Sequence, residues 1–90
     1  MRIRDTIAEK LTKAFSPDHL AVIDESHRHK GHAGWREGGE THFRVSIVAA
    51  AFAGKSRLER HRLINQALAA ELAGDVHALA IEAAAPGDAN

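Results

Sequence analysis

The chain has 90 residues and a mass of 9.7 kDa, which is enough for one small domain. Its 44% hydrophobic content is typical of a globular fold, and the absence of cysteine excludes disulfides, a thiol nucleophile and a thiolate metal site built by this chain alone. Twelve Lys and Arg against twelve Asp and Glu give a formal net charge of +0, which disfavours nucleic-acid binding driven by overall charge and leaves only a local basic patch.

A spacing of four between apolar residues predicts an amphipathic helix over about residues 2–15. The apolar stripe consists of Ile3, Ile7, Leu11 and Phe15. The helix should end at residues 16–18, because Pro17 disfavours helical geometry in the residue before it.

The N-terminus carries no apolar stretch of the kind found in signal peptides or membrane spans, so we expect a cytoplasmic protein that does not enter a membrane.

Two strands are predicted next, separated by a long loop. Residues 19–26 have an apolar centre, β-branched residues and polar ends, which is typical of a short strand. Residues 41–50 alternate, with Phe43, Val45 and Ile47 on one face and His42, Arg44 and Ser46 on the other. We expect the second strand to be half-buried, to pair antiparallel with the first, and to leave His42 exposed on its polar face.

The intervening loop, residues 27–40, concentrates histidine and glycine. His27, His29 and His32 form an H-x-H-x-x-H pattern, whose imidazoles could bind zinc or copper. The alternative is a solvated polar loop, and the spacing alone favours it because a glycine-flanked loop does not hold ligands in place. Trp35 either packs over the sheet edge or contacts a partner.

A second helix is predicted to begin after Ser56, because Ser56 and Glu59 match a capping box. Its apolar side carries Leu63, Ile64, Ala67, Leu68 and Leu72. Gly74 is expected to close it in the left-handed conformation. The helix start is basic and, with its backbone amides, could bind phosphate, although an ordinary solvated helix start is an equal alternative.

A third alternating segment, residues 76–83, predicts the last strand. His77, Leu79 and Ile81 fall on one face, and Val76, Ala78, Ala80 and Glu82 on the other. The order implies a two-layer α+β domain with helices on one face of a three-stranded sheet, the third strand being parallel to the second after a crossover.

We place the domain at residues 1–85 and a flexible tail at 86–90. We predict no enzymatic activity, since the sequence has no nucleophile–base pair, paired carboxylates or nucleotide-binding glycine motif.

Several segments, in their order and spacing, resemble the BolA family from about residue 3 to residue 86. They are Asp24-Glu25-Ser26, Gly31-His32, the run from Glu40 to Val45, the run from Phe52 to Leu63, and Glu71-Leu72 followed by Val76-His77-Ala78-Leu79. The resemblance implies a class II KH-like fold, helix–strand–strand–helix–helix–strand. It also implies that the second helix is divided, with a short turn near residues 56–60 and a longer helix after it.

The resemblance further implies a partner of monothiol glutaredoxin that acts in iron–sulfur cluster handling or in iron and redox sensing. A [2Fe–2S] cluster would be held by a glutaredoxin cysteine, a glutathione thiol and two ligands of this chain. The family's ligand pattern carries over to His77 and to His32, while His27 and His29 are extra histidines that could be alternative ligands. Imidazoles on one iron and thiolates on the other resemble the Rieske arrangement. Because imidazole binds iron in its neutral form, cluster binding is expected to weaken below about pH 6.

The family also includes stress-linked regulators of cell shape for which DNA binding is proposed, so a DNA-binding transcriptional regulator is the alternative function. The residues that would bind DNA, or face a glutaredoxin together with the last strand, are Lys55, Ser56, Arg57, Arg60, His61 and Arg62. KH domains clamp nucleotides with a GXXG loop, whereas the corresponding turn here, residues 54–57, lacks the second glycine. That difference weakens the case for sequence-specific clamping of single strands. By itself the chain is expected to be a monomer, with a weak homodimer as the alternative.

Overall fold

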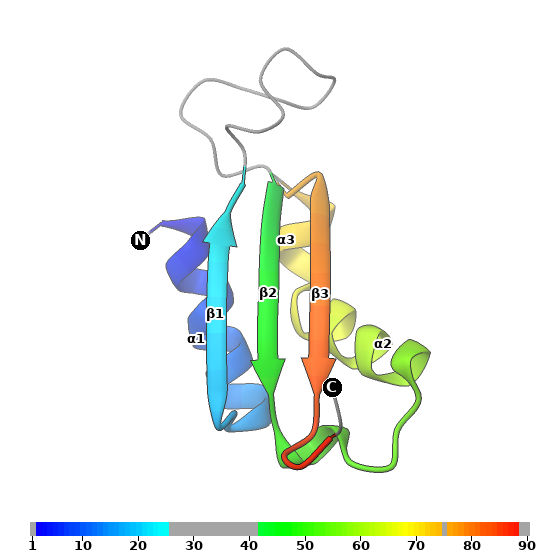
Figure 1. Cartoon of the computed structure of the whole chain (residues 1–90). Helices are drawn as coiled ribbons and strands as arrows, with labels where there is room; N and C mark the ends of the chain where they lie inside the picture. The colour runs from blue at the N-terminus through cyan, green and yellow to red at the C-terminus, as the bar shows by residue number, and fades with distance from the viewer. Residues whose placement is uncertain (1, 26–41, 75, 89–90) are drawn as a thin grey trace.

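The computed structural model describes residues 2–25, 42–74 and 76–88 (Figure 1). Its elements are α1 (Ile3–Phe15), β1 (His19–Asp24), β2 (His42–Val48), the short 3₁₀ helix η2 (Ala50–Phe52), α2 (Arg57–Ala67), α3 (Ala69–Ala73) and β3 (Ala78–Ala84). Figure 1 shows the helices on one face of the sheet, with the opposite face uncovered. The predicted α+β class and the helix–strand–strand–helix–helix–strand order are confirmed.

The three strands lie in the order β1-β2-β3. β1 pairs antiparallel with β2, with Val22 opposite Val45, and β2 pairs parallel with β3, with Val45 opposite Ile81. A parallel pair requires a crossover, which η2, α2 and α3 supply. β1 and β2 are connected through residues 26–41, which lie outside the described residues, as does the loop predicted at 27–40.

The core lies between the sheet and the helices. Its buried hydrophobic residues are Ile7, Leu11, Phe43, Val45, Ile47, Ala49, Phe52, Ile64, Leu68, Val76 and Ala85. The stripes predicted for both helices supply it, with the remaining stripe residues packed around its margin. Phe15 and Phe52 close one end, with ring centroids 5.0 Å apart. Burial of such apolar surface is the main force that holds the two layers together.

Polar contacts define the end of α1 and connect the helices to each other. α1 ends at Ser16, whose φ of 46° is left-handed and whose backbone N–H donates to Thr12 O. Across the helical layer, Lys10 Nζ donates to both carboxylate oxygens of Glu71, at 2.9 and 2.8 Å. This pair ties α1 to α3. Within the described part of the chain, no helix is long and apolar enough to cross a bilayer.

The division of the second helical region differs from the expectation. The resemblance implied a separate turn near residues 56–60, but those residues begin α2, and the break falls at Leu68 instead. The capping box of Ser56 and Glu59 explains the regular start, because each residue hydrogen-bonds a backbone N–H of the other. At Leu68 the backbone turns to φ −108°, ψ 20°, which separates α2 from α3.

Two further predictions for the end of this region are wrong. Gly74 has φ −107°, so it does not close α3 in the left-handed conformation. Val76 lies in the core, although alternation had placed it opposite Leu79 and Ile81. The cause is that β3 begins only at Ala78, and Val76 is held by its N–H donating to Glu71 O at the end of α3. Alternation therefore applies only after this turn.

Candidate functional site

His77 lies just before β3, at one end of the sheet. Its side chain is exposed, and the next residue, Ala78, pairs with His42, the first residue of β2. At the same end, the N–H of Glu25 donates to His42 O at 2.8 Å, directly after β1. β1 therefore ends, and β2 begins, at the end of the sheet where His77 lies (Figure 1).

His42 was predicted to be exposed, and that prediction is wrong. Its residue is only 7% exposed, and its ring lies beside that of His77, with centroids 6.3 Å apart and planes 20° from parallel. The physical reason is its position at the sheet end, where the residue before β3 lies next to it. Sequence reasoning missed this pairing, although the parallel register of β2 and β3 would have indicated it.

The other predicted metal ligands, His32, His27 and His29, lie outside the described residues, so the two-ligand set and the independent zinc or copper loop both stay predictions. Trp35 lies there too. Among the residues that are described, no group of three or more His, Cys, Asp or Glu side chains could hold a metal ion. Among the described residues, this end of the sheet presents the exposed His77, with the buried ring of His42 beside it.

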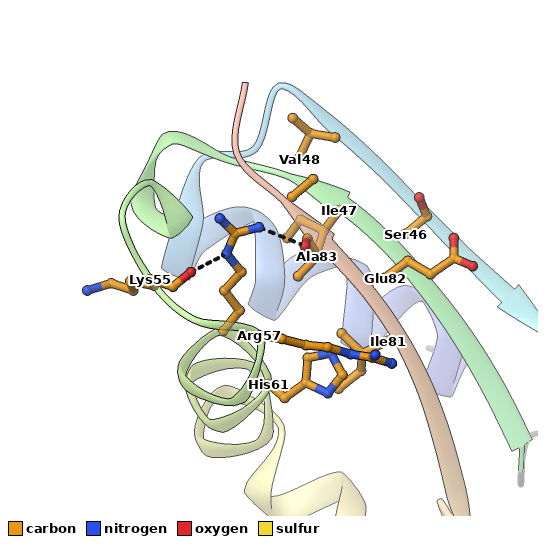
Figure 2. A pocket seen from close by; sticks show the side chains of 11 residues that line it. Ser46, Ile47, Val48, Lys55, Arg57, His61, Ile81, Glu82 and Ala83 are labelled. Atoms are coloured by element: carbon orange, nitrogen blue, oxygen red, sulfur yellow. Dashed lines mark hydrogen bonds between the residues drawn. The ribbon is translucent and has the colours of Figure 1, made fainter. Parts of the chain in front are cut away.

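A groove of about 710 Å³ lies elsewhere, between the start of α2 and the ends of β2 and β3 (Figure 2). Four of the predicted phosphate-binding or partner residues line it: Lys55, Arg57, Arg60 and His61. Figure 2 shows the side chains of Arg57 and His61 extending from α2 toward Ile81 on β3. The two residues are one helical turn apart on the same face, so they act together as one basic wall.

Arg60 has a different role from the other basic residues of the groove. Its Nε donates to Lys55 O at 3.0 Å, and its Nη1 donates to Ala83 O at 3.1 Å and to Asp88 Oδ2 at 2.8 Å. These bonds connect the turn before α2, the end of β3 and the C-terminal segment. Two of them appear as dashed lines in Figure 2. Arg60 therefore holds these three segments together and also contributes a positive charge to the groove.

The remaining predicted residues of this site are Ser56 and Arg62. Arg62 is exposed. Ser56 is the N-cap of α2, where its Oγ accepts from the N–H of Glu59 at 3.1 Å and its own N–H donates to Glu59 Oε1 at 2.8 Å. The bond from the Ser56 N–H, and then that from its side chain, lower the pKa of Glu59. Two backbone amides predicted to help bind phosphate are thus already used, so side-chain cations carry the groove's positive charge.

Two acidic groups that the sequence had not singled out lie at the groove or bond one of its residues. Glu82 lines it, and its Oε1 accepts from Arg44 Nη1 at 3.4 Å. Asp88 Oδ2 accepts from the N–H of Ala85 at 2.9 Å as well as from Arg60. These two bonds, the backbone one foremost, lower the pKa of Asp88. Asp88 belongs to the segment 86–90 predicted to be a flexible tail; that prediction and the boundary at residue 85 remain untested.

The basic groove and His77 lie at opposite ends of β3. His77 precedes the first residue of the strand, whereas Ile81 to Ala84 line the groove. A parallel strand rises about 3.3 Å per residue, so the groove residues of β3 lie from roughly 13 Å (Ile81) to roughly 23 Å (Ala84) along the chain from His77. A single partner that covers both the helix start and His77 would therefore have to follow the length of the strand.

Sequence comparisons identify relatives over nearly the whole chain. The model of the family described as BolA-like protein matches residues 11–88. A Sinorhizobium protein named "Uncharacterized protein in cobS 5'region" is 54% identical over 98% of this chain and 96% of its own length. The Escherichia coli K12 protein named "DNA-binding transcriptional regulator BolA" is 49% identical over 90% of this chain and 73% of its own.

The fold has solved counterparts. The BolA domain of SufE1 from Arabidopsis thaliana superposes with a TM-score of 0.86 at 45% sequence identity, covering 96% of this chain and 94% of that domain. Identity at this level, together with coverage of both chains, shows that the two share a fold.

Proposed function

The chain belongs to the BolA-like protein family, and from this premise we propose that it supplies His77 as an iron ligand to a [2Fe–2S] cluster shared with a monothiol glutaredoxin. The observation that carries the proposal is that His77 is exposed at the end of the sheet where β1 ends and β2 begins, and His32 belongs to the sequence that connects these two strands. This topology lets ligands from two distant parts of the chain meet at one end of the molecule.

The donor set of the chain fits such a shared cluster. The sequence has no cysteine, so the thiolate ligands of the cluster would have to come from a partner. A [2Fe–2S] cluster with imidazole on one iron and thiolates on the other has a higher reduction potential than an all-thiolate cluster. The thiolates would come from glutaredoxin and glutathione, and the second imidazole from His32, with His27 and His29 as alternatives.

The side chains of this chain perform two tasks in the proposed complex. His77, being exposed, can present a ring nitrogen to an iron on a docking partner. His42 lies beside it, nearly parallel and buried, and limits the orientations that the His77 ring can adopt. An orientation fixed in this way reduces the entropy lost when the ligand binds.

The test uses the full chain and a cluster-loaded monothiol glutaredoxin with glutathione. Mixing them should change the visible absorption and circular dichroism spectra, and His77→Ala should abolish the change. The matched control is His19→Ala, since His19 is another exposed histidine at the opposite end of the sheet, paired with Val48. A spectrum equal to that of glutaredoxin alone, or one that His77→Ala leaves unaltered, rejects the proposal.

A second candidate function is DNA binding at the basic groove. Two observations favour it: the groove is lined by Lys55, Arg57 and His61, and the similar Escherichia coli protein is named a DNA-binding transcriptional regulator. Zero net charge means that this local wall has to supply the attraction to phosphates.

Salt titrations of binding to a duplex DNA fragment test this second function. Arg57→Ala should weaken binding several-fold and reduce the slope of log affinity against log salt by about 1. Lys13→Ala is the control with the same charge change, because Lys13 is an exposed residue of α1 paired with Glu9, away from the groove. Equal effects of the two substitutions, or a slope near zero for the unmodified chain, argue against DNA binding there.

A further inference from the structure

One cation that lines the groove, Arg60, is bonded to an anion of the chain itself, Asp88, which lies outside the groove lining. Asp88 Oδ2 lies 2.8 Å from Arg60 Nη1, and the same oxygen accepts the N–H of Ala85 at 2.9 Å. The side chains of Arg60 and Asp88 are 15% and 35% exposed, so the pair is partly screened from water. A carboxylate bound to a guanidinium at this distance is a charge-assisted contact of the kind that a phosphate oxygen makes.

The hydrogen bonds of Arg60 show which donors the carboxylate occupies. Nε is used by Lys55 O, and Nη1 by Ala83 O together with Asp88. A guanidinium has five N–H donors, so these bonds leave the two on Nη2. The first two acceptors are backbone carbonyls that fix the Arg60 side chain in place. Asp88 is the only charged acceptor among the described residues that bonds Arg60, and it lies on a short C-terminal segment rather than on a helix or strand.

The backbone of that segment suits a replaceable contact. It turns through Gly87, which has a φ of +85° and open space where a Cβ would lie. The N–H of Asp88 donates to Ala85 O at 3.0 Å, closing a tight turn. The carboxylate therefore reaches Arg60 from a local turn whose main-chain bonds do not involve the guanidinium. Its loss would leave the backbone carbonyl contacts of Arg60 intact.

We propose that Asp88 is an internal counter-anion that occupies the phosphate position at Arg60 and lowers the affinity of the groove for phosphate-bearing polymers. The inference rests on the second candidate function, DNA binding at the groove. A phosphate that takes the place of Asp88 would gain one Nη1 donor of Arg60 and its uncompensated positive charge, in addition to Arg57 and Lys55. The groove then has low affinity for phosphate while the Asp88 carboxylate is bonded to Arg60, and higher affinity when a phosphate replaces that carboxylate.

Asp88→Asn tests the inference with little change of shape. The amide oxygen can still accept the Ala85 N–H, but the negative charge on Arg60 is removed. We expect affinity for inorganic phosphate, followed at constant ionic strength by the ¹⁵N-bound proton resonance of Arg60 Nε, to rise by about threefold to tenfold. For duplex DNA, the slope of log affinity against log salt should steepen by about 1.

The matched control is Glu82→Gln, which makes the same change of net charge at a residue that lines the groove. Glu82 is 65% exposed and contacts Arg44, with no bond to Arg60. An equal gain in both variants means that the groove responds only to net charge and overturns the inference. Weaker binding by Asp88→Asn, or phosphate binding by neither protein, overturns it as well. If the unmodified chain and both variants fail to bind DNA but Asp88→Asn alone tightens phosphate, the internal counter-anion stands and the DNA function fails.

Discussion

The rings of His42 and His77 lie 6.3 Å apart and 20° from parallel, although all of the helical crossover separates the two residues in the sequence. The parallel pairing of β2 with β3 brings them together, since His42 is in register with Ala78. The ring of His42 is buried and that of His77 is exposed. In the proposed complex, His77 therefore contacts the iron and His42 positions His77.

This division predicts different outcomes for two substitutions at His42. His42→Phe keeps a ring beside His77 and should leave the spectrum of the glutaredoxin complex unchanged. His42→Ala removes the ring and should weaken formation of the complex, because His77 loses its neighbour. The readout is visible circular dichroism during titration with cluster-loaded glutaredoxin. If His42→Phe loses the spectrum as fully as His77→Ala, then His42 is itself a ligand and the support role is wrong.

The capping box at the start of α2 predicts a measurable loss of stability. Ser56→Ala removes the acceptor of the Glu59 N–H and should reduce the free energy of unfolding by about 1 kcal/mol in urea titrations. Ser46→Ala, on β2, is the control and should change it by less than about 0.5 kcal/mol. Equal effects would mean that the cap contributes nothing to stability.

The contact between α1 and α3 predicts a positive coupling energy. Lys10 Nζ bonds both oxygens of Glu71, and the side chains are 39% and 13% exposed. A double-mutant cycle of Lys10→Ala and Glu71→Ala should give about 0.5–1 kcal/mol at low salt, falling as salt is added, since a partly exposed ion pair is screened. Strict additivity of the two substitutions would show that the pair does not couple the helices.

The lowered pKa values of Glu59 and Asp88 predict a loss of stability in acid. Both carboxyls titrate below their ordinary values of 4.5 and 3.8 in the folded chain, so the unfolded chain binds more protons in that range. Their contribution to stability is full above the ordinary values and is lost as the pH falls through the lowered ones. In urea titrations between about pH 6 and pH 2, the double variant Glu59→Gln, Asp88→Asn should show a flatter pH dependence. An unchanged curve contradicts this account.

The fold could be predicted from the sequence because local rules and packing agree in most elements. The stripe containing Ile7 and Leu11, the alternation of β2 and the capping box each predicted an element that the structure confirms. Prediction failed where tertiary contacts override local pattern. Val76 is drawn into the core by a bond to Glu71 O, and the helix divides at Leu68, where no glycine or proline marks a break.

The candidate sites were predictable only as residue types and short spacings. The basic start of α2 was singled out in this way, whereas His77 was singled out as a ligand only through the resemblance to the BolA family. The burial of His42 and the position of Asp88 on Arg60 depend on strand register and on a C-terminal turn, and neither leaves a local pattern in the sequence. The separation of the two sites by the length of β3 likewise became evident only from the sheet.

The most direct test of the central claim is the nitrogen hyperfine coupling of the reduced cluster in the glutaredoxin complex. With this chain labelled at histidine with ¹⁵N and the glutaredoxin unlabelled, pulsed electron paramagnetic resonance should detect strongly coupled ¹⁵N, and His77→Ala should remove the coupling assigned to that residue while His19→Ala keeps it. A cluster that shows no coupled ¹⁵N, or whose coupling survives intact in His77→Ala, would contradict His77 as an iron ligand.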